Sequence, residues 1–197
     1  MKTIIAAVST FLVCVPLFAA DVGNLRKAPD FSFNLPEKGV QQLSQYRGKV
    51  VALEFIFTTC PHCQAASKMM TKLQEEYGPR GLQVIDVAVN QNADLLVDNF
   101  ARDFKVNFPV GWDPSDRMMA FMGWDPKERF VVPQLVLIDR KGMIHYQTPS
   151  TETPDWDKLM TPEAVRAHIE ELINLGGGAT ASAAHHKALP GLDTPAR

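Results

Sequence analysis

The apolar positions of this chain fall into runs and periodicities that predict alternating strands and helices between residues 25 and 175. Two near-continuous apolar runs, Val50–Phe57 and Leu82–Val89, have the character of strands that are covered on both faces of a sheet. Between them, the segment from Pro61 to Tyr77 is predicted to be a helix, because proline is tolerated in a first turn and Gly78-Pro79 ends the pattern. Its apolar face is expected to carry Ala65, Met69, Leu73 and Tyr77.

The second half of the chain continues the same alternation. The pattern predicts a helix over Ala93–Phe104 capped by Asn92, a short strand over Phe108–Val110, a helix over Ser115–Met122, strands over Gln134–Ile138 and Met143–Gln147, and a last helix that opens at Thr161-Pro162-Glu163 and ends at Gly176. Strands that alternate with helices and end in a hairpin indicate an α/β protein with a central mixed β-sheet flanked by helices.

The two ends of the chain are expected to lie outside this domain. Residues 1–20 combine an early lysine, an apolar run from Ile4 to Phe18 and a terminal Ala19-Ala20, which is typical of a cleaved secretory signal. The run is short for a membrane-spanning helix, so a retained membrane anchor is the lesser alternative. Residues 176–197 are dominated by small residues, glycine and proline, which predicts a disordered tail. Residues 25–175 are therefore expected to form one domain.

Composition narrows the functional classes. Apolar residues make up 46% and charged residues 21%, as in a soluble globular protein, and a net charge of -2 gives no reason to expect a nucleic-acid partner. The chain has three cysteines, too few for a disulfide-rich scaffold or a four-cysteine zinc site. Removal of the predicted signal leaves Cys60 and Cys63, and no metal site is expected.

These two residues form a Cys-x-x-Cys pair, Cys60-Pro61-His62-Cys63, where a predicted buried strand gives way to a helix. A zinc site would need a second pair of ligands, and a haem attachment site would need histidine where Gln64 stands. A helix N-terminus presents unpaired N–H groups and a partial positive charge, which stabilise a thiolate. Because the thiolate is the reactive form of cysteine, this placement predicts a redox-active pair.

The two cysteines are expected to play different parts. Cys60, at the helix entrance, should be exposed and attack first, whereas Cys63, one turn further on, should be buried and resolve the mixed disulfide. Pro61 would hold the first turn. A partly protonated His62 would favour the Cys60 thiolate and make the disulfide a better oxidant; the alternative is a solvated turn residue. No bound cofactor is expected, because the dithiol itself carries two electrons.

An ordered set of segments resembles a known family. The set comprises Ala28-Pro29-Asp30-Phe31, Tyr46-Arg47-Gly48-Lys49-Val50-Val51, the Cys-x-x-Cys pair, Val132-Pro133 and Ile138-Asp139-Arg140-Lys141-Gly142. It resembles the thioredoxin superfamily, and more closely the exported TlpA/ResA-type branch and its AhpC/TSA (redoxin) relatives, over about residues 25–175. The resemblance implies a thioredoxin-like fold with an N-terminal β-hairpin extension, and the activity of a thiol–disulfide oxidoreductase.

The chain also departs from the usual family pattern. The Pro61-His62 dipeptide differs from the Gly-Pro that is usual in thioredoxins and is similar to that of the DsbA oxidases. Thr59 stands where relatives commonly have tryptophan. The surface around Cys60 is therefore expected to differ from that of most relatives.

The resemblance implies roles for three further residues. Members place a buried carboxylate six residues before the first cysteine, which is the position of Glu54. An acid inside an apolar strand should have a raised pKa and could accept the proton of Cys63; the alternative is a solvated Glu54 outside the core. Pro133 matches the family's cis-proline, whose preceding residue, here Val132, pairs with substrate backbone. The alternative there is an ordinary trans proline.

The sequence as a whole predicts disulfide exchange with cysteine-containing exported proteins, in the periplasm, with a separate redox partner that recycles the pair. Contact with the membrane would be transient, through the signal. The Pro61-His62 dipeptide favours oxidation of substrates and the TlpA/ResA-like scaffold favours reduction. One rival function is that of a peroxiredoxin, whose motif needs threonine where Phe57 stands. Another is a copper-delivery protein that uses Cys60, Cys63 and His145.

Overall fold

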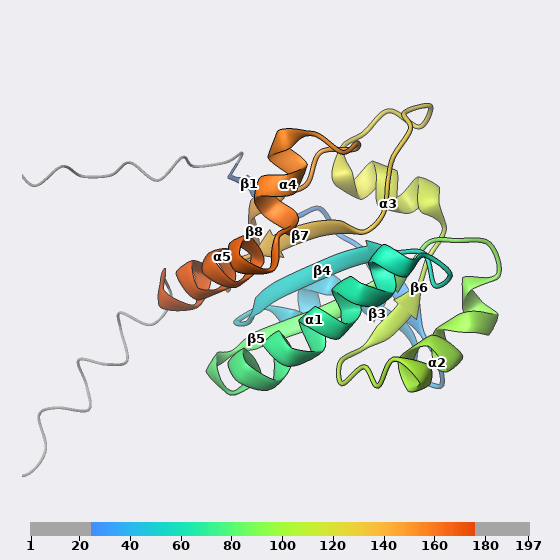
Figure 1. Ribbon diagram of the computed structural model, residues 1–197, viewed down its shortest axis with the longest axis horizontal. Helices are drawn as coiled ribbons and strands as arrows, with labels where there is room; N and C mark the ends of the chain where they lie inside the picture. The colour runs from blue at the N-terminus through green and yellow to red at the C-terminus, as the bar shows by residue number, and fades with distance from the viewer. Residues whose placement is uncertain (1–24, 176–197) are drawn as a thin grey trace, which may run out of the picture.

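The computed structural model describes residues 25–175, so the predicted signal and the predicted tail lie outside the described residues (Figure 1). The strands are β1 (Arg26–Lys27), β2 (Ser32–Leu35), β3 (Gly39–Gln42), β4 (Val50–Ile56), β5 (Leu82–Ala88), β6 (Val110–Trp112), β7 (Gln134–Ile138) and β8 (Met143–Gln147). The helices are α1 (Pro61–Tyr77), α2 (Ala93–Asp103), α3 (Ser115–Met122), α4 (Pro154–Met160) and α5 (Pro162–Leu175), with short 3₁₀ turns at Leu43–Tyr46 and Gly78–Arg80.

All the strands join one mixed sheet in the order β1-β8-β7-β4-β5-β6-β2-β3. The central strand β4 runs parallel to β5 and antiparallel to β7. Strand β5 in turn runs parallel to β6. The β2–β3 hairpin lies at one edge and pairs with β6. The predicted mixed α/β architecture with an N-terminal hairpin is confirmed.

Two apolar layers cover the two faces of the sheet. Because side chains alternate along a strand, Ala52 and Ile56 of β4 point to one face and Leu53 and Phe55 to the other. The first face is covered by α1, α2 and α5, and Figure 1 shows α1 crossing in front of β4 and β5. The second face is covered by α3 and by apolar residues of β2 and the segment before it.

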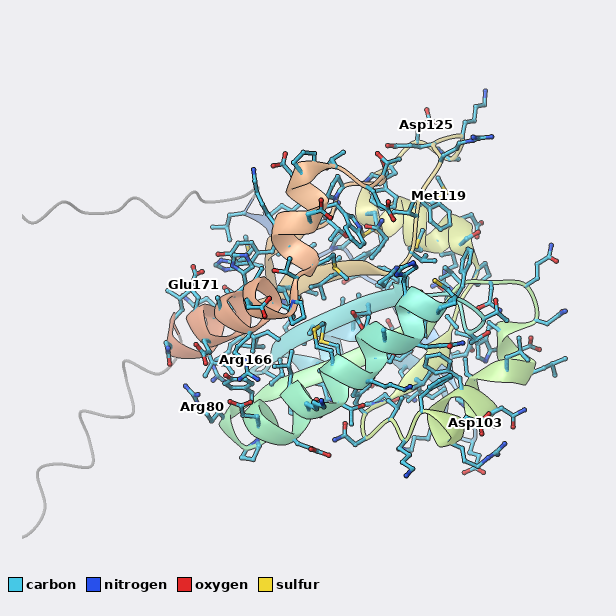
Figure 2. The ribbon with its side chains drawn as sticks, viewed as in Figure 1. Arg80, Asp103, Met119, Asp125, Arg166 and Glu171 are labelled. Atoms are coloured by element: carbon cyan, nitrogen blue, oxygen red, sulfur yellow. The ribbon has the colours of Figure 1, made fainter. Side chains whose placement is uncertain are left out.

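Polar contacts tie α5 to α1 at the edge of the first layer. The guanidinium of Arg166 donates to Glu76 at 2.7 Å, and the hydroxyl of Tyr77 donates to Glu170 at 2.5 Å. Figure 2 shows Arg166 and Arg80 near the end of α1 where α5 approaches it. These contacts join α1, the helix that carries the cysteines, to α5.

Four local expectations were wrong. The strand predicted at Phe108–Val110 lies at Val110–Trp112, because Pro109 has no N–H and offers the β5 ladder only its carbonyl, 3.0 Å from the Asp86 N–H. Asn92 makes no side-chain cap; it adopts a left-handed conformation with φ of 56°.

Ala65 is exposed, since the buried face of α1 runs through Ala66, Met70, Leu73 and Tyr77. Helix α4 was not predicted, although the Thr153 hydroxyl accepts the Trp156 N–H at its start.

Candidate active site

Cys60 lies where the chain leaves the sheet and enters α1. It occupies the N-cap position with an extended backbone (φ −82°, ψ 121°), and Pro61 follows as the first helical residue. The N–H of Cys60 donates to the carbonyl of Phe57 at 3.1 Å, while its own carbonyl accepts the Gln64 N–H at 3.0 Å. The partial positive charge of the helix N-terminus therefore lies next to the half-buried Cys60 sulfur.

Cys63 lies one turn further along α1 and has no exposed surface. The backbone N–H of Phe57 approaches its sulfur at 3.4 Å. Burial is the main cause that raises the pKa of the Cys63 thiol far above its ordinary value. Both cysteines are free thiols, so the structure is that of the reduced protein, with one accessible sulfur and one enclosed sulfur.

The loop between β4 and the cysteines is held by side-chain amides. Asn90, just after β5, accepts the Thr58 backbone N–H with its side-chain oxygen at 2.8 Å. The Gln64 side chain donates to the Thr58 carbonyl at 3.2 Å. Thr58 is buried, so its N–H needs a partner within the protein. Asn90 therefore positions the loop, a role that the sequence analysis did not assign to it.

The segment before β7 faces the first cysteine. The Val132–Pro133 peptide bond is cis, as the resemblance implies. The carbonyl oxygen of Val132 lies 3.9 Å from the Cys60 sulfur. Gln134, which is fully buried, donates from its side chain to the Val131 carbonyl at 2.8 Å and so fixes this segment on the sheet. Val132, with Pro133 directly after it, thus lies beside the accessible sulfur.

Glu54 is fully buried on the face of the sheet that α1 covers. Desolvation raises its pKa well above the ordinary value, and the neighbouring Asp86 raises it further. Ionisation of Glu54 would raise the pKa of the Cys63 thiol further, so the carboxyl lies within electrostatic reach of that sulfur. The alternative of a solvated glutamate is wrong.

Of the remaining predicted residues, His62 is exposed on the first turn of α1 beside Cys60. His145 lies apart from the cysteines: its ring contacts Asp139 at 3.0 Å, and its place on β8 is level with the start of β4, whereas Cys60 follows the end of β4. Within residues 25–175, no three histidine, cysteine, aspartate or glutamate side chains form a group that could hold a metal ion. The ligand set of the copper-delivery alternative is therefore not assembled.

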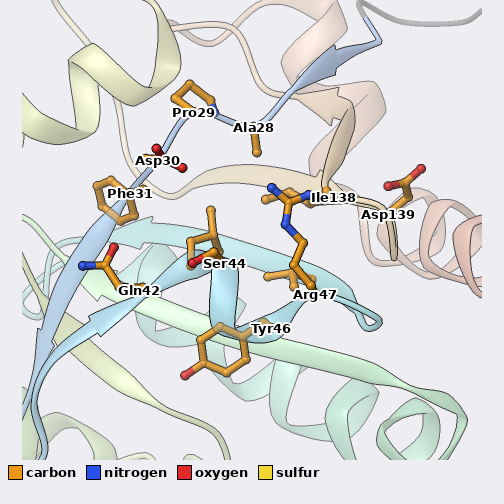
Figure 3. A pocket seen from close by; sticks show the side chains of 13 residues that line it. Ala28, Pro29, Asp30, Phe31, Gln42, Ser44, Tyr46, Arg47, Ile138 and Asp139 are labelled. Carbon is orange, nitrogen blue, oxygen red and sulfur yellow. The ribbon is translucent and has the colours of Figure 1, made fainter.

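A small pocket lies far from the cysteines. Figure 3 shows it between the segment Ala28–Phe31, Arg47 and the end of β7 at Ile138. Its apolar walls, which include Phe31, Leu43 and Val51, belong to the second apolar layer, on the face of the sheet opposite Cys63. This pocket therefore has no part in the chemistry of the thiols.

Comparison with known proteins agrees with the geometry. Residues 25–147 match the sequence profile of the AhpC/TSA family. Thiol-disulfide oxidoreductase ResA from Geobacillus thermodenitrificans (strain NG80-2) is 30% identical over 145 residues, which are 74% of this chain and 75% of that protein. The same name belongs to a relative from Geobacillus kaustophilus (strain HTA426), which is 30% identical over a segment of the same length.

Solved structures share the fold. The crystal structure of a proposed thiol:disulfide interchange protein DsbE from Chlorobium tepidum superposes with a TM-score of 0.61 at 27% identity, covering 77% of this chain and 99% of that chain. The solution structure of a thiol:disulfide interchange protein from Bacteroides sp. superposes with a TM-score of 0.63 at 16% identity, covering 84% and 97% of the two chains. The thioredoxin-like fold expected from the sequence is confirmed.

Proposed function

Because the chain belongs to the AhpC/TSA family and is a thiol–disulfide oxidoreductase of the TlpA/ResA type, we propose that it exchanges disulfides with cysteine-containing exported proteins through Cys60 and Cys63. The single observation that carries this proposal is the unequal placement of the two thiols. Cys60 is accessible at a helix N-terminus, whereas Cys63 is enclosed one turn away. Only the first can meet a protein partner.

The exchange follows from this placement. The Cys60 thiolate attacks one sulfur of a substrate disulfide, forms a mixed disulfide and releases the other substrate sulfur as a thiolate. Cys63 then loses its proton and attacks the Cys60 sulfur, which forms the Cys60–Cys63 bond and releases the second substrate thiolate. The reverse sequence oxidises a substrate dithiol. The pair carries both electrons, so the step draws on no cofactor, and a separate redox partner returns the pair to its working state.

Val132 and Pro133 are proposed to hold the substrate. The Val132 carbonyl lies beside the Cys60 sulfur, and Gln134 fixes the segment from behind. An extended substrate that pairs with the Val132 backbone would have its own sulfur directed towards Cys60. Substrate recognition would then rest mainly on backbone contacts, which suits an enzyme that acts on many cysteine-containing proteins.

We further propose that the protein works outside the cytoplasm, in the periplasm. The support is the signal-like pattern of residues 1–20 and the chemistry of the pair, since disulfides persist in oxidising compartments. Within residues 25–175, no helix has the length and apolar character needed to cross a membrane.

One experiment separates this function from its rivals. The reduced full chain is incubated in parallel with a disulfide-containing protein, a hydroperoxide and copper(I), and thiol loss and metal binding are measured. Disulfide exchange that outpaces hydroperoxide reduction, without copper retention, is the expected result. Hydroperoxide turnover that outpaces protein disulfide exchange would instead favour a peroxiredoxin, and stoichiometric copper retention would favour a delivery protein.

A further inference from the structure

Two carboxyl groups, Glu54 and Asp86, face one another in the interior. They are register partners on the parallel strands β4 and β5 and point to the same face of the sheet, towards α1. Both residues have no exposed surface. Two buried acids at adjacent positions are costly to ionise together, because each charge is desolvated and repels the other.

The hydrogen bonds around the pair are unequal. The Ser67 hydroxyl on α1 donates to Oδ2 of Asp86 at 2.6 Å. Neither oxygen of Glu54 has a hydrogen-bond donor among the described residues, and neither has Oδ1 of Asp86. The two carboxyl groups influence each other's pKa, and a shared proton would satisfy the oxygens that lack a donor. The pair therefore holds one proton, and Ser67 favours the charged form of Asp86, which places that proton on Glu54.

Few other groups can influence the pair. From α1 it is faced by Cys63 and Ser67. Its neighbours in the sheet are apolar: Leu135 of β7 opposes Glu54, and Val110 of β6 opposes Asp86. The residues of α2 and α5 that reach this layer are also apolar. Among the described residues, no basic side chain contributes to the pKa shift of either carboxyl.

We propose that Asp86 is the final acceptor of the Cys63 proton and that Glu54 is the relay between them. Glu54 cannot simply absorb the proton, because it already carries one. It takes the thiol proton on one oxygen and passes its own proton from the other oxygen to Asp86. Ser67 is a positioning residue that keeps Asp86 ionised and ready. This inference rests on the proposed exchange function and assigns its proton acceptor.

The step balances. Cys63 thiol, protonated Glu54 and ionised Asp86 become Cys63 thiolate, protonated Glu54 and protonated Asp86. The thiolate then forms a bond to the Cys60 sulfur, and the bond between Cys60 and the substrate breaks. The substrate sulfur leaves with the electron pair and takes a proton from solvent. When the disulfide is next reduced, the proton on Asp86 returns through Glu54 to the Cys63 sulfur.

The test uses an aromatic disulfide whose two halves are released separately. Reduced full chain is mixed rapidly with dithiobis(nitrobenzoate), and the coloured thiolate is followed over a range of pH. Attack by Cys60 releases the first half, and resolution by Cys63 releases the second. A Cys63→Ser variant, which should give only the first release, assigns the two phases.

Asp86→Asn is expected to slow the second release by about a hundredfold near neutral pH and leave the first release unchanged, because general-base catalysis commonly contributes that much. The wild-type second rate should level off above neutral pH, whereas the Asp86→Asn rate should continue to rise with pH. Ser67→Ala should keep the levelling but move it to higher pH. Asp113→Asn serves as the matched control, since Asp113 is buried but pairs with Arg117.

The outcomes separate the inference from the function on which it rests. A wild-type protein without a second release would contradict the exchange function itself. Two normal releases in Asp86→Asn, with the wild-type pH profile in the second, would overturn the relay alone. A uniform loss of both phases in Asp86→Asn, with the pH profile unchanged, would show only a structural role and would overturn the relay as well.

Discussion

The sulfur of Cys60 lies 3.9 Å from the carbonyl oxygen of Val132, although 72 positions separate the two residues in the sequence. The sheet produces this contact, because β7 runs antiparallel to β4 and its first residues therefore lie at the end of β4 from which the cysteine loop emerges. The buried pairing of β4 with β7 thus holds the reactive sulfur next to the segment that contains Val132.

The two cysteines should respond differently to serine. Cys60→Ser is expected to abolish exchange, because the remaining thiol is enclosed and its raised pKa keeps it protonated. Cys63→Ser should accumulate mixed disulfides, since Cys60 still attacks and nothing resolves the product. Non-reducing gels of each variant incubated with a disulfide-containing protein measure both the loss of exchange and the accumulation of mixed disulfides. Trapping by Cys60→Ser rather than Cys63→Ser would reverse the assignment.

Glu54→Gln should slow the resolution of the mixed disulfide by Cys63 and leave the first attack by Cys60 unchanged. The amide keeps the volume of the side chain but cannot take a proton from Cys63, so the second release of the aromatic disulfide assay should slow. Alkylation of Cys60 by a small reagent, which needs no help from Glu54, serves as the internal control and should stay nearly constant. Resolution at the wild-type rate near neutral pH would remove Glu54 from the mechanism.

His62 is expected to tune the direction of exchange. If its partial charge stabilises the Cys60 thiolate, His62→Pro should make the reduction potential of the pair more negative, by about 30 mV for each tenfold loss of thiolate stabilisation. Equilibration with glutathione measures the potential. Because proline also stiffens the turn, His62→Ala isolates the charge, and added salt should shrink its effect since His62 is exposed. Potentials unchanged in both variants would leave His62 as a turn residue.

The buried carboxyl pair should make stability fall as pH rises. Burial raises the pKa of Asp86 from 3.8 to about 7 and raises that of Glu54 as well. Between the unfolded and folded pKa values, the folded protein holds more protons than the unfolded chain, so the free energy of unfolding decreases as pH increases through that window. Urea unfolding of the reduced protein at several pH values should show this decrease in the free energy of unfolding.

A comparison of variants isolates this contribution. Burial lowers the pKa of His168, which gives an opposite slope just below its ordinary pKa of 6.5. That slope is common to the wild type and to Asp86→Asn, so the difference between the two proteins cancels it. The difference should favour Asp86→Asn increasingly as pH rises from the ordinary pKa of an aspartate, 3.8, towards the folded pKa of Asp86 at about 7. A difference that does not vary with pH would contradict the raised pKa of the carboxyl pair.

Asn90→Ala should loosen the cysteine loop. The substitution leaves the buried Thr58 N–H without its acceptor, at a cost of about 1–3 kcal/mol in the free energy of unfolding. Exchange should slow as well, because the loop carries Cys60. Asn90→Asp retains an acceptor oxygen and is the matched control. If alanine and aspartate behave alike in urea unfolding and in exchange, the hydrogen bond does not position the loop.

The sequence predicted those elements whose boundaries are marked by proline and glycine. Helix α1 runs from Pro61 to Tyr77 and α3 ends before Gly123, as expected. The local signal failed at Asn92, where a left-handed backbone replaced a side-chain cap. Strand β6 was misplaced because its bounds are set by partners distant in sequence. The pattern of apolar and polar residues within one strand does not show which distant strands will pair with it.

The site was predicted in part for a related reason. Glu54 is marked in the sequence as an acid inside an apolar run, and Asp86 carries the same signal within its own strand. What joins the two is the register of β4 against β5, and the sequence does not state that register. The role of Ser67 is still harder to predict from the sequence, because it depends on the hydrogen bond that this helical serine donates to Asp86.

The enclosure of Cys63 also bears on damage. An oxidant that reaches this protein meets the Cys60 sulfur and converts it to a sulfenic acid, the first and reversible rung of cysteine oxidation. The protected neighbour is one helical turn away and condenses with it, giving the Cys60–Cys63 disulfide and one molecule of water. The same buried thiol that completes the exchange thus spares the reactive sulfur from irreversible oxidation, and the repaired product is an ordinary intermediate of the working cycle.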